Sequence, residues 1–271
     1  MVPTVNDLIQ EFFSWAPQEL AEDWDNVGLQ VGYPYWPVKR AVLSLDVTPL
    51  TLAFALKVKA DIVISHHPLI FTPLTCLNLN QTTARLLAGF LRHEIAVVSM
   101  HTNLDSARGG VNDRLAALIG IENLEPLVPN SVHKDLGLGR IGELPEPMYP
   151  DEFLSAVASS LGRECMAVAG TVQGKIEKVA ICSGSGSSLF QDAVDRGVHA
   201  YVSGEIKHST AREAQAQGVL VVDAGHFETE RPVVFSMREF LETKSKEKGW
   251  QLDVAVFEEE QSPFKYWKSE P

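Results

Sequence analysis

The sequence predicts an α/β protein of two related, interlocked lobes with mixed, mostly parallel sheets. Short runs rich in β-branched residues, such as residues 62–65, have the composition of strands covered on both faces. Segments with apolar residues at helical spacing alternate with these runs, which is typical of β-α-β units. The order of elements in the first half recurs in the second, and the 271 residues, 45% of them hydrophobic, suffice for two cores.

The first lobe is expected to span residues 1–125 and to begin with a helix. Apolar side chains recur at helical spacing in residues 1–17, which carry no basic segment of the kind that opens a signal peptide. Residues 24–32 mix turn-forming with apolar residues, so we expect a loop there. Asp25 and Asn26 in this loop are either ordinary surface residues or part of a site.

A β-α-β unit follows this loop. Residues 40–46 are expected to form a strand, and Thr48 and Pro49 are residue types preferred at the N-cap and first position of a helix. This helix runs to about Lys59, and the next strand, residues 62–65, comes soon after it. Because such crossovers are right-handed, we expect the two strands to be parallel and to share one sheet.

The remainder of the first half alternates in the same way. Residues 71–80 carry few helix or strand signals and are expected to form a surface loop, whereas residues 81–93 have an apolar helical face. A strand at residues 95–100 and a helix that ends at Ile119 complete the pattern. Five prolines and several glycines in residues 122–150 predict a long connection or a lobe boundary.

The second lobe is expected to span residues 126–271. Its helix at residues 151–162 precedes strands near residues 166–169 and 178–182. The glycine- and serine-rich segment 183–188 then forms either a tight turn or a backbone cradle for an anion, and it lacks the Lys-Ser/Thr ending of a P-loop. We expect the C-terminal segment to pack back on the first lobe.

An internal repeat supports the two-lobe interpretation. Three pairs of strands match between the halves: residues 41–44 with 179–183, 62–65 with 200–203, and 95–99 with 219–224. Since helices of similar character separate the matched strands, each lobe is expected to contain a β-α-β-α-β unit.

Charge and cysteine content exclude several classes of protein. A net charge of -12 without a Lys/Arg cluster argues against duplex nucleic-acid binding, which depends on basic surfaces. Cys76, Cys165 and Cys182 are widely spaced and odd in number, so we expect neither a disulfide framework nor a thiolate zinc site. This use of cysteine is typical of a reducing compartment, and the expected location is the cytoplasm. No run approaches the roughly twenty apolar residues that cross a bilayer, so we expect no membrane partner.

Ligand-type side chains follow two strands of the first lobe. His66 and His67 come directly after one strand, and Pro68 ends that strand because it cannot donate a ladder hydrogen bond. His101 and Asp105 follow the next strand. The adjacent histidines alone suit a metal site or a structural role. Because parallel strands end at one edge of the sheet, Asp105 adds a candidate carboxylate ligand there. His101 either binds the metal itself or orients one of the residues that bind it.

His226 and Glu230 follow the matching strand of the second lobe. Four residues apart, they share one face if the chain turns helical at Phe227. Glu230 alone suits a solvated residue of a capped helix, but Arg231 and Pro232 favour a helix start and a carboxylate near other charges. The predicted metal ligands, at a site between the lobes, are His66, His67, Asp105, His226 and Glu230.

These stretches together resemble the NIF-three-like dinuclear-metal family, whose bacterial members are often named homologues of a GTP cyclohydrolase I of a second type. The resemblance covers nearly the whole chain and is carried by residues 25–32 (DNVGLQVG), 45–48 (LDVT), 65–68 (SHHP), 101–105 (HTNLD), 110–113 (GVND), 203–207 (SGEIK) and 225–231 (GHFETER). It implies two metal ions bound by the five predicted ligands, and a ring-shaped homo-hexamer whose sites face an internal cavity. Relatives vary around residue 208, so His208 is not assigned as a ligand.

The expected function is a dinuclear divalent-metal-dependent hydrolase that acts on a nucleotide or similar small molecule. Histidines and carboxylates suit zinc, iron or manganese, and two such ions bridged by Asp105 or Glu230 would activate water. The resemblance implies ring opening of the GTP cyclohydrolase type. His101 is the candidate catalytic residue, as a general acid or an orienting group, against a structural role. The alternative is a non-catalytic metal-binding oligomer with a regulatory or metal-handling role.

Overall fold

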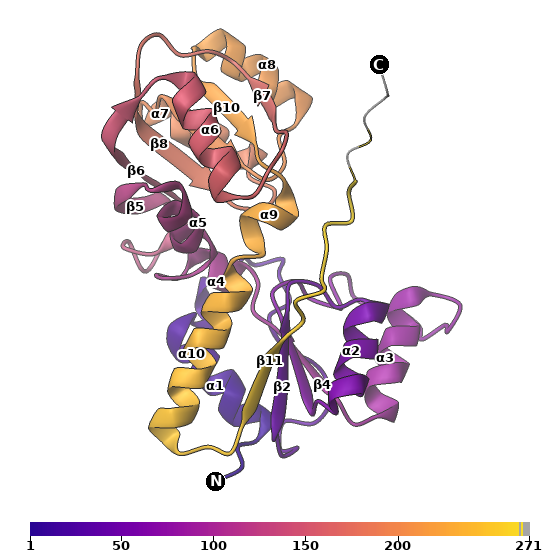
Figure 1. Cartoon of the computed structure of the whole chain (residues 1–271). Coiled ribbons are helices and arrows are strands. Elements are labelled where there is room, and N and C mark those ends of the chain that lie inside the picture. Colours follow the sequence, from indigo (N-terminus) through magenta and orange to yellow (C-terminus); the bar gives the residue numbers. More distant parts are fainter. Residues whose placement is uncertain (266, 268–271) are drawn as a thin grey trace.

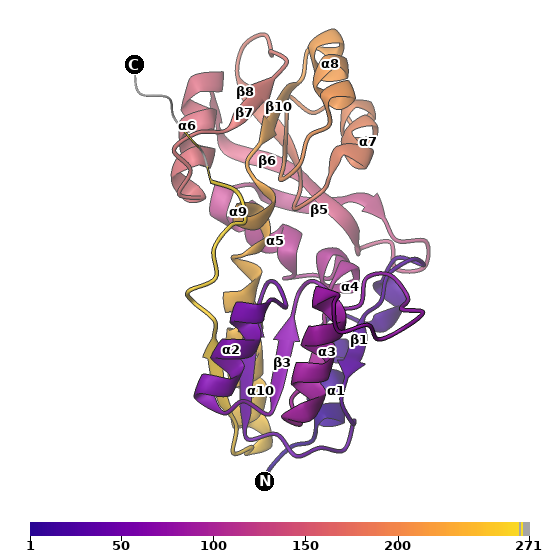
Figure 2. The same cartoon turned by 90° about the vertical axis from the view of Figure 1, so that its right-hand side faces the viewer.

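The computed structural model describes residues 1–265 and Trp267, and it consists of two α/β lobes stacked end to end (Figure 1). The N-terminus lies at the far end of the first lobe. The chain enters the second lobe through α4 (Thr102–Ser106) and α5 (Val111–Ile119) and returns through α9 (His226–Glu230) and α10 (Val233–Lys248) (Figure 2). The predicted architecture of two interlocked lobes is confirmed.

The first lobe is built on a five-stranded sheet whose strand order is β1-β4-β3-β2-β11. The central strands and β11 are parallel, and β1 is antiparallel to β4. The bounds are β1 Gly28–Val31, β2 Arg40–Ser44, β3 Ile62–Ser65, β4 Ala96–Ser99 and β11 Asp253–Val256. Buried side chains alternate between the two faces, as the pleat requires: Leu43 faces one core and Val42 the other.

Helices cover both faces of this sheet. Helix α1 (Val5–Trp15) packs with α10 on one face, and α2 (Pro49–Val58) packs with α3 (Thr82–Arg92) on the other. Helix α2 begins as predicted, because Thr48 accepts a hydrogen bond from the Thr51 N–H and Pro49 occupies the first turn. The predicted parallel pairing of the strands before and after this helix is also confirmed.

The second lobe contains a six-stranded sheet whose order is β5-β6-β8-β9-β10-β7. Strands β8 to β10 are parallel, like β2 to β4, whereas β5, β6 and β7 join by antiparallel pairing. The bounds are β5 Glu122–Pro129, β6 Gly137–Met148, β7 Ala167–Ala169, β8 Ile176–Cys182, β9 Ala200–Ser203 and β10 Leu220–Asp223. The repeat predicted from the sequence therefore corresponds to the three parallel strands of each lobe.

The helices of the second lobe also lie on both faces of its sheet. Helix α5 and α6 (Pro150–Ser160) share one core, and α7 (Phe190–Asp195) and α8 (His208–Gln217) share the other. Two short 3-10 helices, Gln18–Leu20 and Ser187–Leu189, lie in the connections.

Two predicted connections are strands instead. The expectation of a long connection at residues 122–150 is wrong, because β5 and β6 form an antiparallel pair there. The prolines are tolerated because β5 lies at a sheet edge, and because Pro145 and Pro147 fall where the pairing of β6 with β8 is interrupted. The loop expected at residues 24–32 likewise contains β1, whose irregular pairing with β4 hid the strand pattern.

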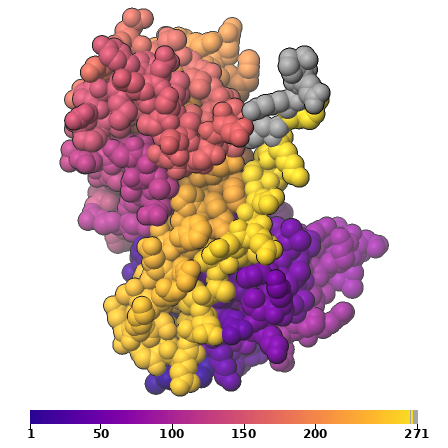
Figure 3. All heavy atoms as spheres, viewed as in Figure 1, coloured from indigo at the N-terminus to yellow at the C-terminus, as the bar shows by residue number. Residues whose placement is uncertain are grey.

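Side-chain packing groups the elements differently from their order in the chain. Helix α5 packs on the second sheet, and α10 and β11 return to the core of the first lobe. The division at residue 125 remains a prediction. After β11 the chain lies over the junction between the lobes, as the yellow segment in Figure 3 shows.

Within the described residues, none of the helices combines the length and apolar character that crossing a membrane requires.

Candidate metal centre

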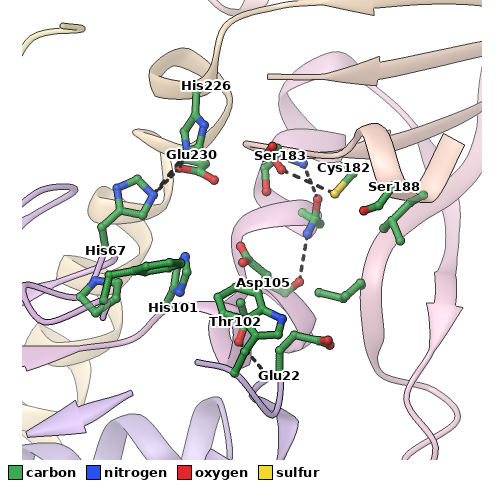
Figure 4. Close-up of a pocket in the computed structure, with 17 residues that line it drawn as sticks. Glu22, His67, His101, Thr102, Asp105, Cys182, Ser183, Ser188, His226 and Glu230 are labelled. Carbon is green, nitrogen blue, oxygen red and sulfur yellow. Dashed lines mark hydrogen bonds and ion pairs between the residues drawn. The ribbon is translucent and has the colours of Figure 1, made fainter. Parts of the chain in front are cut away.

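The predicted ligands meet at the carboxyl ends of β3, β4 and β10, where the two lobes face each other (Figure 4). A cavity of about 420 Å³ opens beside them. His67, His101 and Glu230 lie on one side of it, and Cys182, Ser183 and Ser188 lie on the other. Its size suits a small molecule.

The two adjacent histidines are fixed by the end of β3. The His66 N–H donates to the carbonyl of Ser44, and the His67 N–H donates to that of Leu45. The hydroxyl of Ser65 donates to the carbonyl of His67 at 2.7 Å, which closes the turn after the strand. His66 is completely buried, whereas His67 is partly open to the cavity.

The remaining candidates come from two short helices at the junction. His101 is the N-cap of α4, and Asp105 lies one turn further. His226 and Glu230 are the first and last residues of α9, so both side chains point from one face of it. The loop at residues 183–188 packs so closely on this helix that a β-carbon on Gly184 would lie 1.9 Å from Glu230 Oε1. Only glycine fits there, because φ at Gly184 is also positive at +58°.

Glu230 lies at the centre of the cluster. Its Oε2 lies 2.9 Å from Nε2 of both His67 and His226, and its Oε1 lies 3.9 Å from Nε2 of His66. Asp105 Oδ1 is 3.7 Å from the same nitrogen of His66. The two oxygens of one carboxylate therefore face different histidines.

Every histidine of the cluster uses its Nδ1 for an orienting contact. The partners are the carbonyl of Met100 for His66, Asp46 for His67, Asp25 for His101 and Glu205 for His226, all at 2.8 to 2.9 Å. Such contacts leave the Nε2 atoms directed at the centre, and they are typical of histidines that bind metals. Glu260, in the segment after β11, in turn accepts hydrogen bonds from the N–H groups of Leu45 and Asp46.

Several buried polar atoms at this centre lack hydrogen-bond partners in the described part of the chain. They are His66 Nε2, Asp105 Oδ1 and Glu230 Oε2, the last of which lies near two imidazoles without forming a well-directed bond. Buried polar atoms are normally satisfied, so three unpartnered ones within a single cluster of histidines and carboxylates indicate that the cluster binds cations. Imidazole nitrogens and carboxylate oxygens form a donor set that suits zinc, iron or manganese.

The pKa values of these groups show how strongly their charges compete. Burial lowers the pKa of His66 to about 3, although the charge of Glu230 opposes this shift. Burial raises the pKa of Asp105 to about 7. Burial also opposes the charged forms of His67 and His226, but hydrogen bonds and charge from carboxylates outweigh it and raise their pKa values to about 10 and about 9. His66 is thus neutral near pH 7, the state in which an imidazole binds a metal.

At Glu230 and Asp25, too, contacts with neighbouring groups outweigh the effect of burial on the pKa. Burial disfavours the ionised form of Glu230, but contacts with His226 and His67 hold the pKa of this carboxyl well below its ordinary value. At Asp25, hydrogen bonds from His101 and Thr102 outweigh burial and lower the pKa to about 2. Both carboxylates are therefore ionised near neutral pH.

The structure brings all six predicted site residues together. Among the described residues, three groups of side chains could each hold a metal ion, because the ligand atoms within a group all lie within 4.8 Å of one another. These groups are His66 with Asp105 and Glu230, His67 with His226 and Glu230, and His66 with His67 and His101. The unassigned His208 is exposed at the start of α8. Sequence reasoning missed the orienting carboxylates Asp46 and Glu205, although each follows a strand at this edge and had the same positional signal.

Fold and site together define a two-lobed α/β protein with a candidate metal centre between the lobes. The model of the Duf34/NIF3 (NGG1p interacting factor 3) family matches residues 3–263, and the chain belongs to this family. The resemblance seen in the sequence motifs is confirmed.

Individual relatives agree with this assignment. A "GTP cyclohydrolase 1 type 2 homolog" of Clostridium perfringens is 31% identical over 263 residues, which cover 97% of this chain and 99% of that protein. A Bacillus cereus protein related to NIF3 has the same fold, with a TM-score of 0.93 at 24% identity over 98% of this chain and all of that one. Reduced HcgD from Methanocaldococcus jannaschii is similar at a TM-score of 0.81 and 28% identity, over 95% of this chain and 99% of that one.

Proposed function

We propose that this protein is a dinuclear divalent-metal-dependent hydrolase that acts on a nucleotide or similar small molecule. The position of Glu230 carries the proposal, because its two carboxylate oxygens face different histidines. A carboxylate in this position would supply a donor atom to each of two ions. One ion would be held by His66, Asp105 and Glu230, and the other by His67, His226 and Glu230.

The donor set defines the chemistry. A pair of divalent ions held by these residues would lower the pKa of a water molecule and stabilise negative charge on the substrate. His101 is the candidate for moving a proton, because Asp25 holds its Nδ1 at 2.8 Å while the side chain lines the cavity. Asp25 is the positioning residue in this arrangement, and it fixes the tautomer of His101.

Two observations support a small substrate. The cavity of about 420 Å³ lies directly beside the ligand cluster and includes His67, Asp105 and Glu230 in its wall. The relative from Clostridium perfringens carries a name that refers to GTP cyclohydrolase, which supports a nucleotide or a similar compound as the substrate.

Saturating full-length protein with zinc, iron or manganese should give two bound ions per chain by elemental analysis. The metal-loaded protein should then release product from at least one member of a nucleotide panel, and a chelator should abolish that release. Fewer than two ions per chain under controlled loading would contradict the dinuclear site. Two ions without turnover across the panel would favour the alternative, a non-catalytic metal-binding oligomer with a regulatory or metal-handling role.

We also propose that the chain forms a homo-hexamer. Exposed aromatic residues support an oligomer, since Tyr33, Tyr35 and Phe264 are 54%, 65% and 73% exposed. Tyr266, in the aromatic stretch at residues 264–267, lies outside the described residues. Light scattering at micromolar concentration should give six times the mass of one chain. A monomer would contradict an oligomer of any kind, and a dimer would contradict the hexamer.

A further inference from the structure

The cavity beside the candidate metal centre has an aromatic rim. Trp24 and Phe71 both line it, and 58% of each residue is exposed. Their ring centroids are 5.7 Å apart and lie 6.0 and 6.3 Å from the ring of His101. Large aromatic side chains left exposed at the mouth of a pocket are typical of ligand-binding surfaces.

Trp24 is held in place by the residues on either side of it. Its neighbour Asp25 has a completely buried side chain and accepts hydrogen bonds from the backbone N–H and hydroxyl of Thr102. On the other side, the N–H of Glu22 donates to the Thr102 hydroxyl at 2.9 Å. These contacts fix the backbone from which the indole projects, and the indole itself lies against the rings of Phe71 and His101.

Phe71 is held in a similar way through its neighbour Ile70. The carbonyl of Ile70 accepts a hydrogen bond from the Asn26 side chain at 2.7 Å, and its N–H donates to the Gln30 side chain at 3.2 Å. Asn26 and Gln30 belong to the same segment as Trp24, so one hydrogen-bonded unit carries both rings. Preorganised rings lose little conformational entropy when they bind a ligand.

The charge of the cavity restricts what these rings can bind. Among the described residues, its wall contains no Lys or Arg, whereas it contains the carboxylates of Glu22, Asp105 and Glu230. Positive charge at this wall therefore comes from its histidines and would come from bound metal ions, not from Lys or Arg side chains. A planar ring without charge needs no such partner and can bind by stacking on Trp24 and Phe71.

Polar groups lie on the opposite wall. Ser183 and Ser188 face the histidines across the cavity in Figure 4, and Ser185 and Ser188 are exposed. Their hydroxyl groups can donate to or accept from the polar edge or the sugar of a ligand whose ring lies against the aromatic rim.

We propose that Trp24 and Phe71 form a stacking subsite for an uncharged, planar heteroaromatic ring, such as the base of a nucleoside. The inference deepens the proposed function and rests on it, because it takes this ring as the part of the substrate that the protein recognises. Base stacking on aromatic side chains is tolerant of base identity, so purine and pyrimidine nucleosides should both bind.

Calorimetric titration with guanosine, cytidine and ribose 5-phosphate tests the subsite on full-length protein, both zinc-loaded and after chelation. Both nucleosides should bind in either state, and ribose 5-phosphate should bind at least about tenfold more weakly than guanosine after chelation. Trp24→Leu and Phe71→Leu should each weaken guanosine binding about tenfold, and Trp24→Phe should weaken it less. The control is Tyr149→Leu, since Tyr149 is 56% exposed but lies outside the cavity, and it should leave the affinity unchanged.

Three results of the titrations would overturn the subsite: no detectable binding of either nucleoside, guanosine affinity within about twofold of the parent in both leucine variants, or ribose 5-phosphate binding as tightly as guanosine after chelation. Turnover is measured separately. Guanosine binding that depends on Trp24, without hydrolysis of any nucleotide, would retain the subsite and remove the hydrolase. Hydrolysis with an unchanged KM in Trp24→Leu would retain the hydrolase and remove the subsite.

Discussion

Replacing Glu230 with alanine should lower metal affinity by more than about a hundredfold, because even outer partners of metal ligands contribute tenfold to a hundredfold. The physical reason is that Glu230 belongs to both groups proposed to hold an ion, with oxygens near His66 on one side and near His67 and His226 on the other. Its loss therefore removes a donor from each site. Metal content after equilibrium dialysis measures the effect.

Glu228→Gln provides the matched control. Glu228 lies on the same helix but pairs with Arg163 on the side away from the cluster, so its replacement should leave metal content unchanged. His67→Ala should also weaken binding, and the double variant with Glu230→Ala should be far from additive because both residues act on one cluster. Thermal unfolding of each variant checks that the fold survives. If Glu230→Ala kept both ions while His67→Ala lost them, the site would belong to the first lobe alone.

Arg140→Ala should lower the free energy of unfolding by about 3–5 kcal/mol, the cost of breaking a buried ion pair from one side. Arg140 lies on β6 of the second lobe, is 3% exposed and pairs with Asp113 of α5. Its guanidinium also donates to the carbonyls of Ser106 and Ala107 at the end of α4, at 3.3 and 2.8 Å. The substitution thus leaves buried acceptors unsatisfied at the junction of the lobes.

Urea unfolding measures this effect, and Arg238→Ala is the control. Arg238 pairs with Glu242, four residues further along α10. The side chains of Arg238 and Glu242 are 43% and 37% exposed. Exposed pairs of this kind contribute at most about 0.5 kcal/mol. A loss for Arg140→Ala no greater than that of the control would show that the contacts of Arg140 do not stabilise the junction.

The elements predicted with success have signals that are local in the sequence. The helix after Thr48 begins where it does because its cap and its proline are adjacent residues. The strand at residues 62–65 is recognisable because it is covered on both faces and is therefore apolar throughout. Strands β1 and β5 lie at sheet edges, where irregular pairing and prolines are tolerated, and their sequences look like loops.

The sequence by itself determined the family and the residue types of the candidate site, since ligand-type side chains follow strands whose carboxyl ends must share an edge. Tertiary structure alone decided which atoms face one another. Glu230, and not Asp105, lies between His66 on one side and His67 on the other because α9 packs close to the end of β3. These two elements are separated by about 160 residues of chain, and the 3.4 Å contact between His226 and His67 depends on the same packing. Likewise, Asn26 and Gln30 join the segment of Trp24 to that of Phe71 through hydrogen bonds to Ile70, about 40 residues further along the chain. Such contacts depend on long-range packing, and no local pattern of residues encodes them.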